Sequence, residues 1–217
     1  MVLKKPAEMS QKSTDITWHA GSVTPADRHK ITGNQPCVVW LTGLSGCGKS
    51  TIAMALESAL IRAAHLAFVL DGDNLRHGLN RDLGFSEADR TENIRRVGEV
   101  AKLLADAHII AICSFISPYR ADRAGVRRRI EPSAFIEVFV DAPLSVCEAR
   151  DPKDLYKKAR ANIAAGNAMS FTGLDAPYEA PSNPEVHLKT AEQSVEASVA
   201  AIMSVLVDRR VISGAGA

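Results

Sequence analysis

The clearest chemical motif in the chain is a glycine-rich run that ends in a lysine and two hydroxyl residues. Residues 43–51 read GLSGCGKST and fit the pattern G-x-x-x-x-G-K-[ST]. Glycines let such a loop curl until its backbone N–H groups point at a phosphate, and the N-terminus of a following helix adds a favourable dipole. Lys49 would reach the β- and γ-phosphates, and the Ser50 hydroxyl would ligate Mg²⁺. The motif predicts a site for a nucleoside triphosphate with magnesium.

Two acids follow an apolar run in the sequence Asp71-Gly72-Asp73-Asn74. Such carboxylates are costly to bury unless they meet a metal, a positive group or a substrate proton. Asp73 is a candidate for orienting or deprotonating an attacking hydroxyl, and Asp71 for holding Mg²⁺ through water or fixing the glycine-rich loop. The alternative is that both acids cap a helix N-terminus. Asp141, which ends another apolar run, is a competing carboxylate of lower rank.

Arginine and phenylalanine side chains near these acids indicate an anionic ligand with an aromatic face. Arg76 and Arg90 follow the DGDN motif, and a guanidinium fork can bind two oxygens of a phosphate or sulfate. Phe85 and Phe171 lie in polar, glycine-bearing loops, where a ring is poorly placed for core packing but could stack on a purine. Alternatively, the arginines lie on solvated helix faces and the rings anchor their loops.

Alternating strand and helix patterns would position these motifs. Strands are predicted near 37–43, 66–73, 109–117, 135–143 and 184–190, and helices near 50–63, 89–107, 119–130 and 191–208. This alternation predicts an α/β fold with a mainly parallel five-stranded sheet, right-handed crossovers and helices on both faces. Ligands of such sheets bind at the carboxyl ends of the strands, where the polar motifs stand. The fold class predicted is a P-loop NTPase-type three-layer α/β/α sandwich.

Composition narrows the class of protein. The 217 residues carry a formal charge of +1, which argues against a nucleic-acid binder. No apolar run approaches the roughly 20 residues of a membrane span, and the N-terminus lacks a signal-peptide pattern. The four cysteines form no CxxC pair, which favours a reducing, cytoplasmic compartment. Residues 1–33 are expected to form a partly ordered arm, 34–210 one domain and 211–217 a flexible tail.

Several longer stretches of the sequence resemble those of the adenylylsulfate kinase family. The similar stretches cover most of residues 37–182 in family order, and ITWH at 16–19 is similar to the N-terminal arm of bacterial members. The phrases are WLTGLSGCGKST, VLDGDNLRHGLNRDLGFSEADRTENIRRVGEVAKL, SFISPYRADR, EVFVDAPLSVCEARDPKDLYKKAR and FTGLDAPYEAP.

The resemblance implies that ATP and adenylyl sulfate give ADP and 3′-phosphoadenylyl sulfate, with Mg²⁺. It also implies a lid over roughly 148–175, whose closure would exclude water, and commonly a homodimer. The chain has no room for a fused sulfurylase, so a separate ATP sulfurylase would supply adenylyl sulfate.

Site residues follow from the resemblance position by position. Asp73 would act on the 3′-hydroxyl, and Arg150 would lie near the ATP adenine. The ATP phosphates would be bound by Gly43, Leu44, Ser45, Gly46, Cys47, Gly48, Lys49, Ser50 and Thr51. The acceptor would be held by Arg76, Arg90 and Asn93 at its phosphosulfate and ribose end, by Phe85 and Phe171 at its adenine, and by Ile116, Ser117 and Lys153.

Ser117 has two interpretations. The equivalent serine in the family has been regarded as a phosphoenzyme intermediate, whereas direct in-line transfer would leave Ser117 only lining the pocket. A serine needs a nearby base to become a good nucleophile, and the sequence shows no evident one, so direct transfer is favoured.

The lid segment departs from the family pattern. Members usually read YKKARAGxIxxFTG, often with a lysine before FTG, but this chain reads YKKARANIAAGNAMSFTG. The segment 161–170 is longer and lacks that lysine, which bears on lid geometry and substrate affinity rather than on the transfer chemistry.

Two other functions stay open on the sequence. One is a P-loop kinase that acts on another small hydroxyl or nucleotide. The other is a catalytically silent nucleotide-binding module that regulates a partner sulfurylase, against which the intact Lys49, Ser50 and Asp73 argue.

Overall fold

The protein folds around one five-stranded parallel sheet. The computed structural model describes residues 13, 15–17, 19–167 and 169–213. The strands lie in the order β2-β3-β1-β4-β5, and every pair is parallel. Their bounds are β1 Val38–Thr42, β2 Ala67–Asp71, β3 Ile110–Ser114, β4 Phe135–Asp141 and β5 Val186–Lys189.

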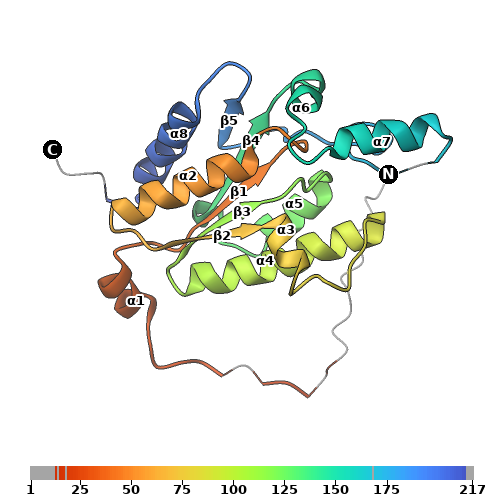
Figure 1. Cartoon of the computed structure of the whole chain (residues 1–217). Helices are drawn as coiled ribbons and strands as arrows, with labels where there is room; N and C mark the ends of the chain where they lie inside the picture. The colour runs from red at the N-terminus through yellow and green to blue at the C-terminus, as the bar shows by residue number, and fades with distance from the viewer. Residues whose placement is uncertain (1–12, 14, 18, 168, 214–217) are drawn as a thin grey trace, which may run out of the picture.

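Helices cover both faces of this sheet and complete three layers (Figure 1). The predicted α/β/α sandwich with a five-stranded sheet is therefore confirmed. Helices α2 (Lys49–Arg62) and α8 (Val195–Asp208) pack on one face, and α4 (Glu87–Asp106) and α5 (Arg120–Arg127) pack on the other. Shorter elements are α1 Pro25–Thr32, α3 Gly72–Arg76, the 3-10 helix η1 Pro132–Ala134, α6 Leu144–Arg150 and α7 Leu155–Ala164. Among the described residues, no helix is long and apolar enough to cross a membrane.

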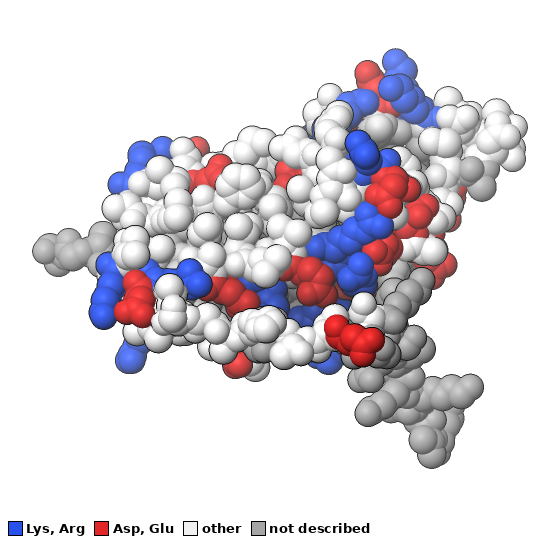
Figure 2. All heavy atoms as spheres, turned by 90° about the horizontal axis from the view of Figure 1, so that it is seen from below, with Lys and Arg blue, Asp and Glu red and all other residues white. Residues whose placement is uncertain are grey.

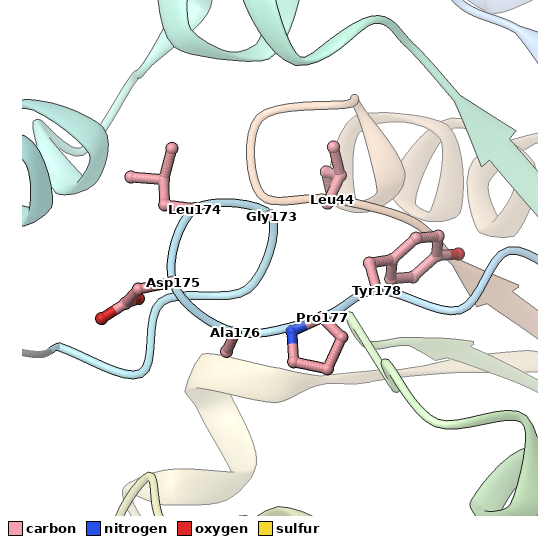
Figure 3. A pocket seen from close by; sticks show the side chains of 7 residues that line it. All are labelled: Leu44, Gly173, Leu174, Asp175, Ala176, Pro177 and Tyr178. Carbon is pink, nitrogen blue, oxygen red and sulfur yellow. The ribbon is translucent and has the colours of Figure 1, made fainter.

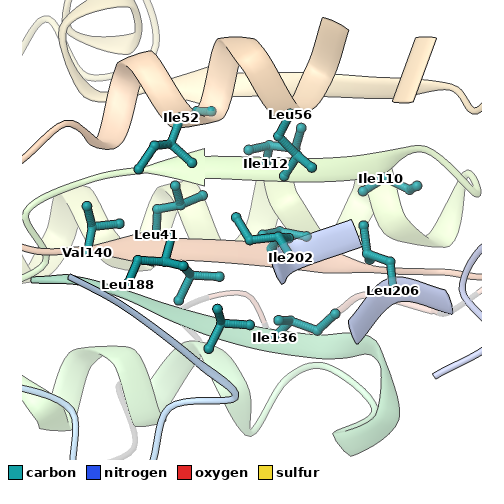
Figure 4. Close-up of a cluster of buried hydrophobic side chains, with 14 of the residues drawn as sticks. Leu41, Ile52, Leu56, Ile110, Ile112, Ile136, Val140, Leu188, Ile202 and Leu206 are labelled. Carbon is teal, nitrogen blue, oxygen red and sulfur yellow. The ribbon is translucent and has the colours of Figure 1, made fainter. Parts of the chain in front are cut away.

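Strand β1 shows why the sequences of the central strands are unbroken apolar runs. All five of its residues are buried. Val39 and Leu41 belong to the core under α2 and α8, whereas Val38 and Trp40 belong to the core under α4. Leu41 belongs to one cluster of buried side chains with Ile52 and Leu56 of α2 and Ile202 and Leu206 of α8 (Figure 4). A strand buried on both faces has no polar side to alternate with, so its sequence is apolar throughout.

The predicted N-terminal arm contains a helix that the sequence reading missed. Helix α1 begins with a capping box, in which Thr24 Oγ1 accepts from Asp27 N (3.2 Å) and Asp27 Oδ2 accepts from Thr24 N (3.1 Å). Residues 1–12, 14 and 18 of the arm lie outside the described residues. Immediately after α1, Asn34 is fully buried and donates through Nδ2 to the carbonyls of Leu66 and His108.

The predicted tail starts too early. Val211 and Ile212 are buried against the α2–α8 core, and Gln35 N donates to Val211 O at 2.9 Å. After α8 the backbone turns at Arg210, whose φ is 57°, and returns these two apolar side chains to the core. The prediction of a flexible 211–217 was therefore wrong at its first two residues, and residues 214–217 lie outside the described part of the chain.

Ion pairs bind many of the surface arginines. Arg96 pairs with Asp82 (2.7 Å) and Glu92 (2.8 Å), and Arg129 pairs with Glu99 (3.2 Å). On the face in Figure 2, basic and acidic side chains are interspersed. These arginines are already paired within the protein, which separates them from those that line the site below.

Gly98 sets the separation of α4 and α5. A Cβ atom at this position would lie 2.8 Å from Cγ2 of the fully buried Val126. A β-branched side chain is stiff, so it yields little to an added methyl group.

We expect Gly98→Ala to lower the free energy of unfolding by about 1–2 kcal/mol, because an overpacking cost of roughly 1–3 kcal/mol exceeds the helix-propensity gain of about 1 kcal/mol. The matched control is Gly125→Ala in α5, where the nearest atom would be the end of the Arg129 side chain at 3.6 Å. This control should be neutral or stabilising in urea unfolding followed by circular dichroism. A Gly98→Ala protein as stable as the parent would contradict the packing argument.

Candidate active site

A cavity of about 1000 Å³ opens at the carboxyl edge of the sheet. This size is at the upper end of the range for small-molecule sites. Its walls come from the glycine-rich loop, the start of α3, the segment after β3 and the segment 148–175, which is the lid that the resemblance predicts. All the site residues predicted from the sequence line it except Gly43 and Leu44. The predicted lining residues are Ser45, Gly46, Cys47, Gly48, Lys49, Ser50, Thr51, Asp71, Asp73, Arg76, Phe85, Arg90, Asn93, Ile116, Ser117, Arg150, Lys153 and Phe171.

Close packing fixes the curl of the glycine-rich loop. Gly46 and Gly48 have φ values of 73° and 103°, which favour glycine, and α2 begins immediately afterwards at Lys49. The Lys49 side chain is buried, and its Nζ donates to the carbonyls of Leu44 (2.6 Å) and Gly43 (3.0 Å). The loop therefore presents a helix N-terminus and a lysine to the cavity, the two groups that an oligophosphate requires.

Leu44 faces away from the main cavity. Its side chain lines a shallower, open pocket of about 510 Å³, opposite the loop Gly173–Tyr178 (Figure 3). Any contribution of Leu44 to phosphate binding is consequently limited to its backbone.

Three oxygen-bearing side chains meet beside the loop. Ser50 Oγ donates to Asp71 Oδ2 (2.9 Å) and lies 3.3 Å from Ser114 Oγ. Asp71 Oδ1 also accepts from Asp73 N (3.0 Å), so Asp71 is the N-cap of α3, as the alternative interpretation had it. Hydroxyl and carboxylate oxygens are ligands that Mg²⁺ prefers, so the donor set fits this ion.

Asp73 projects from the first turn of α3 into the opening of the cavity. Its side chain is 63 % exposed and pairs with Lys153 of the lid. Asp141, the competing carboxylate, lies 2.9 Å from His187 Nε2 and does not line the cavity. The structure thus places Asp73, and not Asp141, at the wall of the cavity.

A cationic and aromatic wall faces the loop across the cavity. The Arg76 guanidinium lies 4.3 Å from the centroid of the Phe85 ring. Arg90 donates through Nη1 to Thr172 Oγ1 (2.5 Å) and through Nη2 to Ser170 O, which ties α4 to the lid. Burial and then the neighbouring charge of Arg90 lower the pKa of Arg76, and such a cluster of like charges favours an anionic ligand.

Two asparagines complete this side of the site. Asn93 is buried on α4, and its Oδ1 accepts from Asn80 Nδ2 at 2.9 Å. Asn80 is fully buried and fixes the amide of Asn93, a contact that the sequence reading did not foresee because Asn80 belongs to no motif.

Hydrogen bonds to its hydroxyl and to its carbonyl hold Ser117 in place. It is buried with a φ of 39°, and its Oγ accepts from Trp40 Nε1 (3.1 Å) and donates to Phe115 O (3.4 Å). Arg123 Nη1 donates to Ser117 O at 2.7 Å. Neither partner of the hydroxyl is a base, so these contacts do not activate Ser117 as a nucleophile.

Other lining residues were missed because they carry no motif. Arg150 donates to the Thr190 carbonyl (2.6 Å), which brings the segment after β5 to the cavity together with Gln193. Met169 also lines the cavity, and Tyr156, which lies behind the lining residues, donates through its OH to Ser45 O at 3.0 Å. Thr190 could have been found only from its place at the carboxyl end of the last predicted strand, because ligands of parallel sheets bind at those ends.

This fold and this cavity define a class before any comparison. A parallel sheet with a glycine-rich phosphate loop, an Mg²⁺-compatible oxygen cluster and a second, cationic wall in the same cavity is the arrangement of a P-loop small-molecule kinase.

Comparison with known proteins identifies the family. A family model described as adenylylsulphate kinase matches residues 35–189. The adenylyl-sulfate kinase of Geotalea daltonii is 54% identical over 206 residues, covering 95% of this chain and 100% of its own, and that of Citrobacter koseri is 56% identical over 198 residues, covering 91% and 96%. The solved structure of the Mycobacterium tuberculosis APS kinase CysC in complex with AMPPNP and APS is 48% identical, with a TM-score of 0.73 over 80% of this chain and 98% of that chain. The chain belongs to the adenylylsulphate kinase family.

Proposed function

We propose that the chain is an ATP-dependent adenylylsulfate kinase, which transfers the γ-phosphate of ATP to the ribose 3′-hydroxyl of adenylyl sulfate. The products are ADP and 3′-phosphoadenylyl sulfate. The observation that carries this proposal is that the phosphate loop, Asp73 and the Arg76–Phe85–Arg90 wall line one and the same cavity. The solved relative that binds AMPPNP and APS supports the same pair of ligands.

The phosphate loop and Lys49 hold ATP. Backbone N–H groups of residues 45–50 point at the phosphates, and Lys49 exchanges its bonds to Gly43 O and Leu44 O for phosphate oxygens. Ser50 and Asp71 would hold Mg²⁺, which neutralises the charge on the β- and γ-phosphate oxygens when bound. Arg150, beside the Thr190 carbonyl, bounds the adenine end.

The opposite wall holds the acceptor. Arg76, Arg90 and Lys153 supply positive charge to the phosphosulfate, and Asn93 binds its ribose end. Phe85 and Phe171 stack on the acceptor adenine, while Ile116 and Ser117 line the pocket. With Arg76 over one face of Phe85, the other face is left for the adenine.

Asp73 is the group closest to the chemistry. It accepts the proton of the 3′-hydroxyl as the O3′–Pγ bond forms and the bond from Pγ to the β,γ-bridging oxygen breaks. Lys153, its partner in the lid, must shift toward the acceptor so that the carboxylate is free. Closure of the lid, 148–175, would exclude water and limit hydrolysis of ATP.

The long lid segment is ordered by Asp175. Its carboxylate accepts from the backbone N–H groups of Met169 (2.7 Å), Ser170 (3.0 Å) and Phe171 (2.5 Å). This contact holds Phe171 at the cavity and places Met169 near the position where the family often has a lysine. Binding of the acceptor therefore relies here on Arg90 and Lys153 for charge.

The oligomeric state, the cellular compartment and the source of adenylyl sulfate are further parts of the proposal. We expect a homodimer in the cytoplasm, where ATP is abundant and the four buried cysteines stay reduced, with a separate ATP sulfurylase as the source of adenylyl sulfate. Exposed apolar side chains at the open β2 edge support a contact between copies, and Phe68 is the most exposed of them at 54 %.

Replacement of Asp73 or Lys49 tests the transfer chemistry. Asp73→Ala and Lys49→Ala should each lower kcat/KM for ADP release with adenylyl sulfate by at least about 100-fold, because one loses the proton acceptor and the other a phosphate contact. Asp106→Ala is the matched control, since Asp106 also forms an exposed ion pair with a lysine, Lys102. Near-normal turnover in both site variants would refute the roles, and turnover of AMP but not of adenylyl sulfate would favour the kinase of another acceptor.

Ser117→Ala separates direct transfer from a phosphoenzyme. The variant should keep turnover within about tenfold of the parent, because it loses two structural hydrogen bonds, each worth about 1 kcal/mol, and no nucleophile. Incubation with γ-labelled ATP should leave no label on Ser117. Labelled serine, together with complete loss of turnover in Ser117→Ala, would establish the covalent route.

Light scattering after size exclusion tests the homodimer. The chain should elute at twice its own mass, and Phe68→Lys should shift it toward the monomer because a charge replaces an apolar contact at the β2 edge. Leu103→Lys, at an exposed apolar position on α4, is the control and should leave the dimer intact. A monomeric parent protein would refute the proposed assembly.

A further inference from the structure

Tyr156, in the first turns of α7, contacts both halves of the cavity. It is 2 % exposed, and its hydroxyl donates to Ser45 O across 111 residues of sequence, at 3.0 Å. Its ring packs edge to face against Phe171, with 4.8 Å between ring centroids and 64° between ring planes. No motif assigned Tyr156 a role, yet it is in direct contact with the phosphate loop and with Phe171.

The hydrogen bond acts on a peptide that faces the phosphates. A trans peptide is planar, so its C=O and its N–H point in opposite directions. With the Ser45 carbonyl held outward by Tyr156, the N–H of Gly46 points toward the interior of the loop. The left-handed backbone of Gly46, packed against Cys147 O, leaves this peptide little other room.

Tyr156 is itself rigidly placed. The Asp151 carboxylate accepts from the N–H of Tyr156 (3.1 Å) and of Lys157 (3.0 Å), which fixes the start of α7. Burial raises the pKa of the Tyr156 hydroxyl, so it stays a proton donor at every physiological pH. On the other side of the ring contact, Asp175 holds the backbone of Phe171.

We infer that Tyr156 is a positioning residue that couples occupation of the phosphate loop to the placement of Phe171 against the acceptor. This inference rests on the proposed function, because it takes the acceptor to bind at Phe171. A triphosphate that draws the Gly46 N–H inward also strengthens the Tyr156–Ser45 hydrogen bond and fixes the ring beside Phe171. The acceptor then binds a preorganised wall, so each ligand raises the affinity of the other.

Calorimetric titration with AMPPNP and Mg²⁺ tests whether Tyr156 supports binding at the phosphate loop. Tyr156→Phe keeps the ring and loses only the hydroxyl, so its Kd for AMPPNP should rise about 2- to 10-fold, the range for one net hydrogen bond. Tyr178→Phe is the matched control, since it loses the hydrogen bond between Tyr178 OH and Thr42 Oγ1 (3.0 Å), outside the cavity. It should show a similar fall in Tm with an unchanged Kd.

Titration of adenylyl sulfate tests whether an occupied phosphate loop raises the affinity for the acceptor. In the parent protein it should bind more tightly with AMPPNP present than without it, and the ratio of the two Kd values should fall at least threefold in Tyr156→Phe. If Tyr156→Phe does not fold, the same ratio of Kd values is measured in Phe171→Leu, which changes the other partner of the ring contact. The ratio should fall in this variant as well. An unchanged AMPPNP Kd or an unchanged ratio in Tyr156→Phe would overturn the inference, as would an equal loss of AMPPNP affinity in Tyr178→Phe.

The two proposals fail in different ways. If the parent protein turns over no adenylyl sulfate, the proposed function is wrong, whereas the effect of Tyr156→Phe on AMPPNP binding is measured without any turnover. If the parent protein is active and the AMPPNP Kd does not respond to Tyr156→Phe, only the role of Tyr156 is wrong.

Discussion

The close approach of backbone to backbone at two glycines holds the phosphate loop in place. A Cβ atom on Gly43 would lie 2.3 Å from Val140 O, and one on Gly46 would lie 2.8 Å from Cys147 O. Because Val140 belongs to β4 and Cys147 to α6, the loop is wedged between the sheet and the beginning of the lid. The curl that exposes N–H groups to phosphate therefore depends on tertiary packing as much as on the flexibility of glycine.

Charge is distributed to match this arrangement. The chain as a whole carries a formal charge of +1, and Arg96 on α4 is paired with Asp82 and Glu92. Around the cavity, by contrast, Arg76 and Arg90 contact backbone carbonyls, a threonine hydroxyl and a ring, which are neutral partners that an anion can replace or join. A protein of balanced charge thus concentrates positive potential where two polyanions would meet.

Much of the fold and of the site could be predicted from the sequence. The central strands β1 and β3 were recognisable because they are buried on both faces, and the phosphate loop because its glycines and Lys49 stand at fixed spacing. The position of Asp73 at the cavity followed from its place two residues after the end of β2. The capping role of Asp71 was an open alternative, and the structure shows that Asp71 bonds both Ser50 and the backbone of α3.

What the sequence did not predict depends on contacts between distant residues. Tyr156 lies on an ordinary amphipathic helix, and nothing local distinguishes it from a core tyrosine. Asn80 gains its place only when the segment before α4 packs against Asn93, and Thr190 only when the segment after β5 packs against the phosphate loop. The burial of Val211 and Ile212 likewise follows from a backbone turn at Arg210, which no glycine or proline marks.

A crystal structure with AMPPNP, Mg²⁺ and adenylyl sulfate tests the central claim most directly. The account predicts the adenine of adenylyl sulfate between Phe85 and Phe171, with its 3′-hydroxyl within about 3.2 Å of the Asp73 carboxylate and in line with the γ-phosphate held by the loop. A structure in which adenylyl sulfate lies outside this cavity, or in which its 3′-hydroxyl is remote from Asp73, would contradict it.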